Sequence, residues 1–229
     1  MQMNLTDLHQ LAIDRVTRAA TGENTAEDLL AELAKFWAET ETALKADDST
    51  DRSHIACCAG CDHCCVINVS ILLPEGVAIS RFLLGLPAAE LEQISARLDD
   101  LWTRIRGLDD DERVMLRRPC AFLDDRGYCL VYPVRPLYCR SFTSTDAESC
   151  KAEIAARAHG QVLPVQAHRY QQELYETCYL GIGDGLTQVG LDGRSFQLSG
   201  LVRYLLRQPN GGADLLTAGE QLVWDDLYA

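Results

Sequence analysis

Apolar residues recur at helical spacing along the first part of the chain. Residues 5–20 carry apolar side chains three or four positions apart, and residues 25–46 repeat this pattern. We expect a helix over each range. Asn24 is the predicted cap of the second helix, because Glu27 follows three residues later and completes a capping box.

The remainder of the chain predicts further helices. Pro74 begins one helix and Pro87 begins the clearest one, since proline is tolerated in a first turn. Additional helices are expected over residues 165–180, 195–207 and 214–225, where apolar positions are again spaced for one helical face.

Two stretches do not follow helical spacing. Residues 66–73 predict a short buried strand or an extended segment, and residues 119–142 are rich in proline and glycine. Asp124–Gly127 has the composition of a tight turn, which would place Cys120 and Cys129 across a hairpin-like loop.

The patterns together predict a mainly α fold, a helical domain in which two cysteine-rich irregular loops converge on a metal site. Thr145 and Glu148 form another predicted capping box, which puts Cys150 in the first turns of a helix. We divide the chain into an N-terminal helical pair (1–54), a cysteine-cluster metal-binding domain (55–150) and C-terminal helices packed on the same core (151–229).

Composition limits the function classes. The chain has 229 residues with 21 Lys+Arg and 34 Asp+Glu, a net charge of −13. This acidic balance argues against nucleic acid or an anionic membrane as partner. No apolar run reaches the ~18 residues of a membrane span. The N-terminus shows no secretory signal pattern, so we expect a cytoplasmic protein.

The number and the clustering of the cysteines are the strongest indication of function in the sequence. In a reducing compartment ten thiols indicate metal binding or redox chemistry more than a disulfide framework. They are also clustered, with five of them inside nine residues. Their positions are 57, 58, 61, 64, 65, 120, 129, 139, 150 and 178.

The first cysteine segment has the spacing of a metal-binding loop. Cys58-x2-Cys61-x2-Cys64 brings three thiols close together, and Gly60 permits the tight backbone that this needs. Cys65 is adjacent to Cys64, and neighbouring side chains diverge. Either one of the two lies outside the first ligand shell or the site holds more than one metal atom.

The second segment contains Cys120, Cys129 and Cys139 at wide spacing, without the second Cys-x2-Cys pair of many structural zinc sites. A triplet with remote further ligands is nearer to iron–sulfur ligation, so iron or an iron–sulfur cluster is slightly favoured and zinc is the alternative. Arg135 and Arg140 flank Cys139 and would offset the negative charge of a metal–thiolate group.

These motifs resemble a known family, the CxxCxxCC cysteine-cluster proteins that chelate zinc or iron (the YkgJ-like family). The resemblance covers residues 55–150 and rests on Cys58 to Cys65, the Pro-Cys-x-Phe-Leu start at 119–123 and the run from Cys129 to Arg140. It implies a metal ion or cluster as partner. The implied ligands are eight cysteines, namely Cys58, Cys61, Cys64, Cys65, Cys120, Cys129, Cys139 and Cys150.

The resemblance leaves the reaction open. One relative, the flagellin lysine N-methylase type, looks like an iron–sulfur enzyme that uses S-adenosylmethionine, so protein modification is an alternative to simple chelation. A thiol redox switch and a structural zinc module are further alternatives. Two zincs, a bridged binuclear site, or a cluster with additional thiols all agree with eight thiolates.

For several other residues we expect an ordinary structural role and no part in metal binding. His63 is expected to be solvated and not a ligand, Glu75 to be a first-turn glutamate, and Cys178 to pack in a helical core. Cys57 and Cys178 lie outside the family pattern. Cys57-x3-Cys61-x2-Cys64 also has radical S-adenosylmethionine spacing, which we interpret as accidental because no strand–helix alternation follows.

Overall fold

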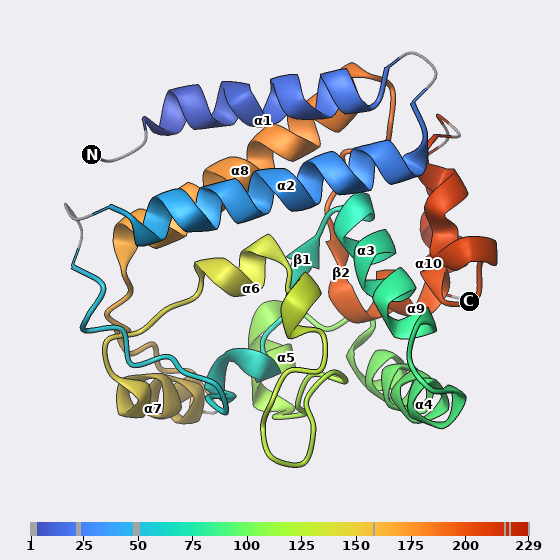
Figure 1. Cartoon of the computed structure of the whole chain (residues 1–229). Coiled ribbons are helices and arrows are strands. Elements are labelled where there is room, and N and C mark those ends of the chain that lie inside the picture. The colour runs from blue at the N-terminus through green and yellow to red at the C-terminus, as the bar shows by residue number, and fades with distance from the viewer. Residues whose placement is uncertain are drawn as a thin grey trace.

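Three long helices form the scaffold of the molecule in a computed structural model, which describes residues 4–21, 24–47, 51–157, 159–217, 219 and 221–228. They are α1 (Leu5–Ala19), α2 (Ala26–Lys45) and α8 (Arg169–Gln188), and α1 packs against both others (Figure 1). The predictions for α1 and α2 are confirmed to within one residue. The helix predicted over 165–180 begins later and extends to Gln188.

Glycines bring α1 and α8 close together. A Cβ atom added to Gly181 would lie 2.7 Å from the His9 carbonyl oxygen and 2.8 Å from the Cβ of Ala12. One added to Gly185 would lie 2.8 Å from the Cβ of Val16. The two helices therefore touch along their backbones, and larger residues at these positions would separate them.

Both predicted capping boxes are shifted by one residue or more. The α2 box consists of Thr25 and Asp28, whose carboxylate accepts the Thr25 backbone N–H at 2.7 Å, so the prediction of Asn24 and Glu27 is wrong. The reason is that the helix begins at Ala26. At α7 (Ala147–Arg157) Asp146 accepts the Glu148 N–H at 2.9 Å, in place of the predicted Thr145. That helix carries Cys150 near its start, as expected.

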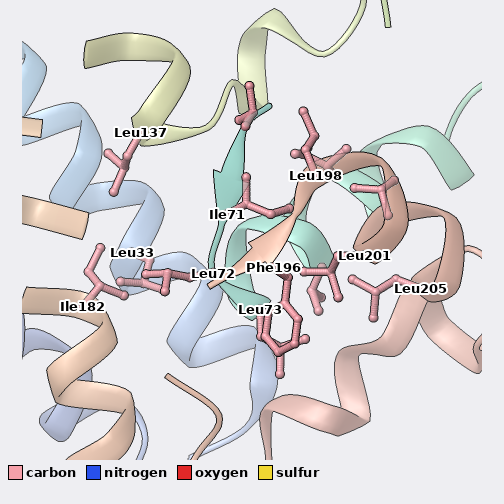
Figure 2. Close-up of a cluster of buried hydrophobic side chains, with 14 of the residues drawn as sticks. Leu33, Ile71, Leu72, Leu73, Leu137, Ile182, Phe196, Leu198, Leu201 and Leu205 are labelled. Atoms are coloured by element: carbon pink, nitrogen blue, oxygen red, sulfur yellow. The ribbon is translucent and has the colours of Figure 1, made fainter. Parts of the chain in front are cut away.

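A two-residue antiparallel pair connects distant parts of the chain. Strand β1 (Ser70–Ile71) pairs with β2 (Phe196–Gln197), and Ile71 lies opposite Phe196. Each strand leads directly into a helix, β1 into α3 (Leu73–Leu84) and β2 into α9 (Leu198–Leu205). Figure 2 shows the buried side chains that gather around this pair, from α2, α3, α8 and α9 among others. Residues 66–73 were predicted to form a short strand or an extended segment, and the structure confirms this only for the second half of the range, which contains β1.

The C-terminal region differs most from the prediction. The helix expected over 195–207 shortens to α9. The one expected over 214–225 is wrong, because the 3-10 helix η3 (Pro209–Leu216) ends within this range and α10 (Trp224–Tyr228) begins only near its end. Gly219 between them has a φ of 65°, which interrupts a right-handed helix.

The remaining elements surround the cysteine segments. The helix predicted from Pro87 is α4 (Ala88–Ile105). The short elements near the second cysteine loop were not predicted, namely α5 (Asp110–Met115), the 3-10 helix η2 (Tyr132–Val134) and α6 (Leu137–Ser141). A mainly helical fold is thus confirmed. Within the described part of the chain, no helix is both long enough and apolar enough to span a bilayer.

Candidate metal centre

The first cysteine loop turns twice within nine residues. The Cys61 N–H donates to the Cys58 carbonyl at 3.1 Å, and Gly60, with a φ of 90°, makes this turn without strain. The Cys65 N–H then donates to the Asp62 carbonyl at 2.8 Å, at the 3-10 helix η1 (His63–Val66). These turns keep the five cysteines of the loop in one small region.

The second loop is a hairpin, as predicted. Leu123 bridges Cys129 in antiparallel fashion, and the Leu130 N–H donates to the Phe122 carbonyl at 2.8 Å. The Asp124 carboxylate closes the turn by accepting the Tyr128 N–H at 2.8 Å. Cys120 and Cys129 consequently occupy the two arms of the hairpin.

Backbone hydrogen bonds join the two loops. The Cys120 N–H donates to the Cys65 carbonyl at 2.8 Å, and the Ala56 N–H donates to the Ser144 carbonyl at the same distance. The Ser144 N–H in turn donates to the Cys57 sulfur at 3.2 Å. Segments more than fifty residues apart in sequence therefore meet below the long helices, where η1, α7 and the loop before α6 lie in Figure 1.

Eight cysteines line a single cavity of about 370 Å³ between these loops. The cavity reaches the surface, since the exposed side chains of Tyr128 and Tyr132 also line it. Convergence of the two loops is thus observed. Among the described residues, however, no three His, Cys, Asp or Glu side chains are placed to hold one ion as they stand. The lining cysteines are Cys57, Cys58, Cys61, Cys64, Cys65, Cys120, Cys129 and Cys139.

Electrostatic interactions divide the thiols into two groups. The inner group contains the hairpin cysteines and the end of the first loop, namely Cys64, Cys65, Cys120, Cys129 and Cys139. The outer group contains Cys57, Cys58, Cys61 and Cys150. Cys150 does not line the cavity but interacts with Cys57 and Cys61 from α7. Cys64 of the inner group also interacts with Cys57 and Cys61, so it connects the inner group to the outer one.

The Cys64 thiol has a lower pKa than an ordinary cysteine. A hydrogen bond from Cys65 lowers the pKa of Cys64 to about 7 and raises that of Cys65 itself. Burial raises the pKa of Cys120 to about 11 and also raises the pKa of Cys129 and Cys139. Because metal ligands are thiolates, filling this site would release protons, starting from Cys64.

The two arginines singled out from the sequence lie in different surroundings. Arg135 lines the cavity, its charge interacts with Cys139, Cys64 and Cys129, and it donates to the Cys139 carbonyl. Arg140 instead pairs with Glu41 of α2 at 3.0 Å and donates to the Arg135 carbonyl at 2.8 Å. Arg135 is therefore in place to offset thiolate charge, whereas Arg140 connects the loop to the helical scaffold.

The sequence analysis did not identify Arg113, the second arginine that lines the cavity. Arg113 of α5 is 2% exposed and lines the cavity, and its Nε and Nη1 atoms have no hydrogen-bond partner among the described residues. Nothing in the local pattern Asp-Asp-Glu-Arg suggested burial, because this run is typical of a solvated helix. Cys57 was also left out of the predicted ligands, although it lines the cavity.

The residues that were expected to have an ordinary structural role lie outside the cavity. His63 does not line it, and its Nδ1 lies 3.7 Å from the Asp62 carboxylate. Cys178 is buried in α8, where burial raises its pKa to about 12, so core packing is confirmed. Glu75 is a buried first-turn residue of α3 that accepts the N–H groups of Leu72 and Leu137, at 2.9 and 2.8 Å.

The donor set agrees with an anionic metal–thiolate group. The cavity combines many sulfurs with two arginines, and an unpartnered buried guanidinium requires a negative charge nearby. A structural zinc ion or an iron–sulfur cluster with four thiolates would supply that charge.

Comparison with known proteins gives one match. A sequence model of the CxxCxxCC family, described as “Putative zinc- or iron-chelating domain”, matches residues 57–178, a range that begins at Cys57 and ends at Cys178. No curated protein and no solved structure matches the chain.

Proposed function

The chain belongs to the CxxCxxCC family of zinc- or iron-chelating domains, and from this premise we propose that its cavity holds an iron–sulfur cluster. The inner group of cysteines supplies the cluster ligands, and the outer group borders it toward the surface. All five inner cysteines belong to the eight ligands expected from the sequence, and the other three, Cys58, Cys61 and Cys150, lie in the outer group.

The observation that carries this proposal is the shape of the sulfur-lined space. Structural zinc sites are closed tetrahedra in which four ligands meet at one ion. Here eight cysteines surround a cavity of about 370 Å³, a volume in the range of small-ligand pockets. A cluster of several metal and sulfide atoms suits thiols distributed in this way better than a single ion does.

Charge supports the same assignment. Four thiolates on an oxidised four-iron cluster leave a net charge of −2. Arg113 and Arg135 both line the cavity, so the surrounding chain already contains two positive charges to balance it. Such a cluster supplies one-electron chemistry when bound, and these arginines would raise its reduction potential by favouring the more negative state.

The proposal is tested by anaerobic purification with iron, zinc and acid-labile sulfide analysis. We expect brown protein with iron and sulfide in equal amounts, about four of each per chain. Cys120→Ser and Cys139→Ser are expected to lose most of the iron. Cys178→Ala is the matched control, since it removes a buried cysteine that does not line the cavity. Colourless protein with one or two zincs and no sulfide would contradict the proposal.

A second candidate is a cluster-dependent protein-modifying enzyme of the flagellin lysine N-methylase type. The observation in its favour is that residues other than cysteine, among them Leu101, Tyr128 and Ser199, also line the cavity, whose volume of about 370 Å³ is in the range of small-ligand pockets. Equilibrium dialysis of cluster-loaded protein with S-adenosylmethionine tests it. Absence of binding at millimolar concentration would dismiss this candidate and leave the chelating role intact.

A further inference from the structure

Arg113 is a buried cation without a conventional partner. Its side chain lies at the cavity with 2% exposure, and neither Nε nor Nη1 finds an acceptor in the described part of the chain. An arginine is charged at every physiological pH. Burying such a charge is costly unless an anion is close, so this position demands an explanation.

The acidic neighbours of Arg113 are engaged elsewhere. Asp110 accepts a hydrogen bond from Asn68 at 2.9 Å, Asp111 pairs with Arg157 at 2.5 Å, and Glu112 caps its own helix at the Asp109 N–H. Helical spacing would have allowed Arg113 to pair with Asp109 or Asp110 at the surface. Its guanidinium is instead directed to the cysteines.

Cysteines are the most numerous polar side chains in the cavity that Arg113 lines. Cys120 is the one whose charge interacts with it. A cysteine thiol carries no charge, and a metal-bound cysteine is a thiolate. Loading the cavity with metal would therefore place additional negative charge beside Arg113.

We propose that Arg113 is the built-in counter-charge of the metal–thiolate group, which strengthens metal binding and destabilises the metal-free fold. This inference rests on the proposed function only in requiring that the cavity binds metal through thiolates. The positive charge of Arg113 is balanced when metal and thiolates are present and is not balanced without them. Removing this charge should therefore raise the stability of the metal-free protein and lower its affinity for metal.

The test compares metal-free stability with metal affinity in the full chain. Thermal unfolding is followed by circular dichroism after chelation under reducing conditions, and Zn²⁺ affinity is measured by competition with a chromophoric chelator. For Arg113→Met we expect the metal-free midpoint to rise by about 2 °C or more. We expect Zn²⁺ affinity to fall by about tenfold or more, since hydrogen bonds to charged groups are lost.

Two further variants separate charge from packing. Arg113→Lys keeps the positive charge and is expected to retain most of the affinity. Arg118→Met removes an exposed charge from the same segment and is expected to change neither quantity. Unchanged affinity in Arg113→Met, an equal loss in Arg118→Met, or failure of Arg113→Met and Arg113→Gln to fold without metal would each overturn the inference.

The result is independent of the identity of the natural metal. Zn²⁺ binding requires thiolates but no sulfide, so a colourless zinc protein with Arg113-dependent affinity would contradict the iron–sulfur proposal and support this inference. Brown protein whose Zn²⁺ affinity and metal-free stability are unchanged by Arg113→Met would support the iron–sulfur proposal and overturn this inference.

Discussion

Glu75 illustrates how one buried side chain connects the helical scaffold to the cysteine region. Its two carboxylate oxygens accept the N–H groups of Leu72, at the start of α3, and Leu137, at the start of α6. Leu137 lies two residues before Cys139, so Glu75 helps to place that cysteine. Burial raises the pKa of Glu75 to about 7.

This pKa predicts that stability depends on pH. The folded state keeps a proton up to about pH 7, whereas the unfolded glutamate releases it near 4.5. The stabilisation is therefore complete below pH 4.5 and is lost as the pH rises through 7. Relative to wild type, Glu75→Gln is expected to gain up to about 3 kcal/mol between pH 4.5 and 8.

Denaturant unfolding of both proteins at the two pH values, with equal metal content, measures this difference. Glu148→Gln, at an exposed position, provides the control and is expected to show no such trend. A Glu75→Gln difference that stays constant with pH would mean that the carboxylate is charged in the folded protein throughout.

At the scale of elements, the crossing of α1 and α8 depends on the absence of side chains. Gly181 and Gly185 lie one turn apart on α8 and face His9, Ala12 and Val16 of α1. Glycine is a poor helix former, so its presence in the middle of a 20-residue helix has a helix-propensity cost that close packing offsets.

We expect Gly181→Ala to destabilise the protein by about 1 to 2 kcal/mol. Overpacking costs about 1 to 3 kcal/mol, and the better helix propensity of alanine returns up to about 1. Leu180→Ala is the matched control, because Leu180 is 59% exposed on the same helix and is expected to change stability by less than about 0.5 kcal/mol. An unchanged or raised unfolding midpoint for Gly181→Ala would show that α1 moves away freely.

Across the whole molecule, the long helices and the first cysteine loop depend on different interactions. The helices share an extended apolar core to which Phe122 and Val131 of the second loop also belong. The first loop is joined to the second by a few backbone hydrogen bonds, such as that from Cys120 to Cys65. Metal binding would add the strongest connection between the loops.

Removal of metal is therefore expected to loosen the loops and to leave the scaffold folded. Hydrogen–deuterium exchange with and without a chelator should show faster exchange in residues 57–65 and 119–150, with α1 and α8 still protected. Exchange that rises equally in α1 and α8 would instead identify a structural zinc module, whose folding depends on the metal.

The sequence predictions are reliable where the interactions that form an element lie within a few residues of one another along the chain. The periodic faces of α1, α2 and α4 and the Asp124–Gly127 turn are local patterns, and the structure confirms them. The helix predicted over 214–225 is wrong because a glycine at positive φ interrupts it. The short helix α5 has too few residues to show a period.

The sequence by itself determined that the candidate site is rich in cysteine and belongs to a zinc- or iron-chelating family, because cysteine spacing is visible in the sequence alone. It also determined the helical class, since that depends on apolar positions within each segment. The tertiary structure alone decided which thiols share the cavity, that Cys57 lines it and Cys150 does not, and that Arg113 is buried at the cavity. These features arise from contacts between segments far apart in the chain, about which local patterns carry no information.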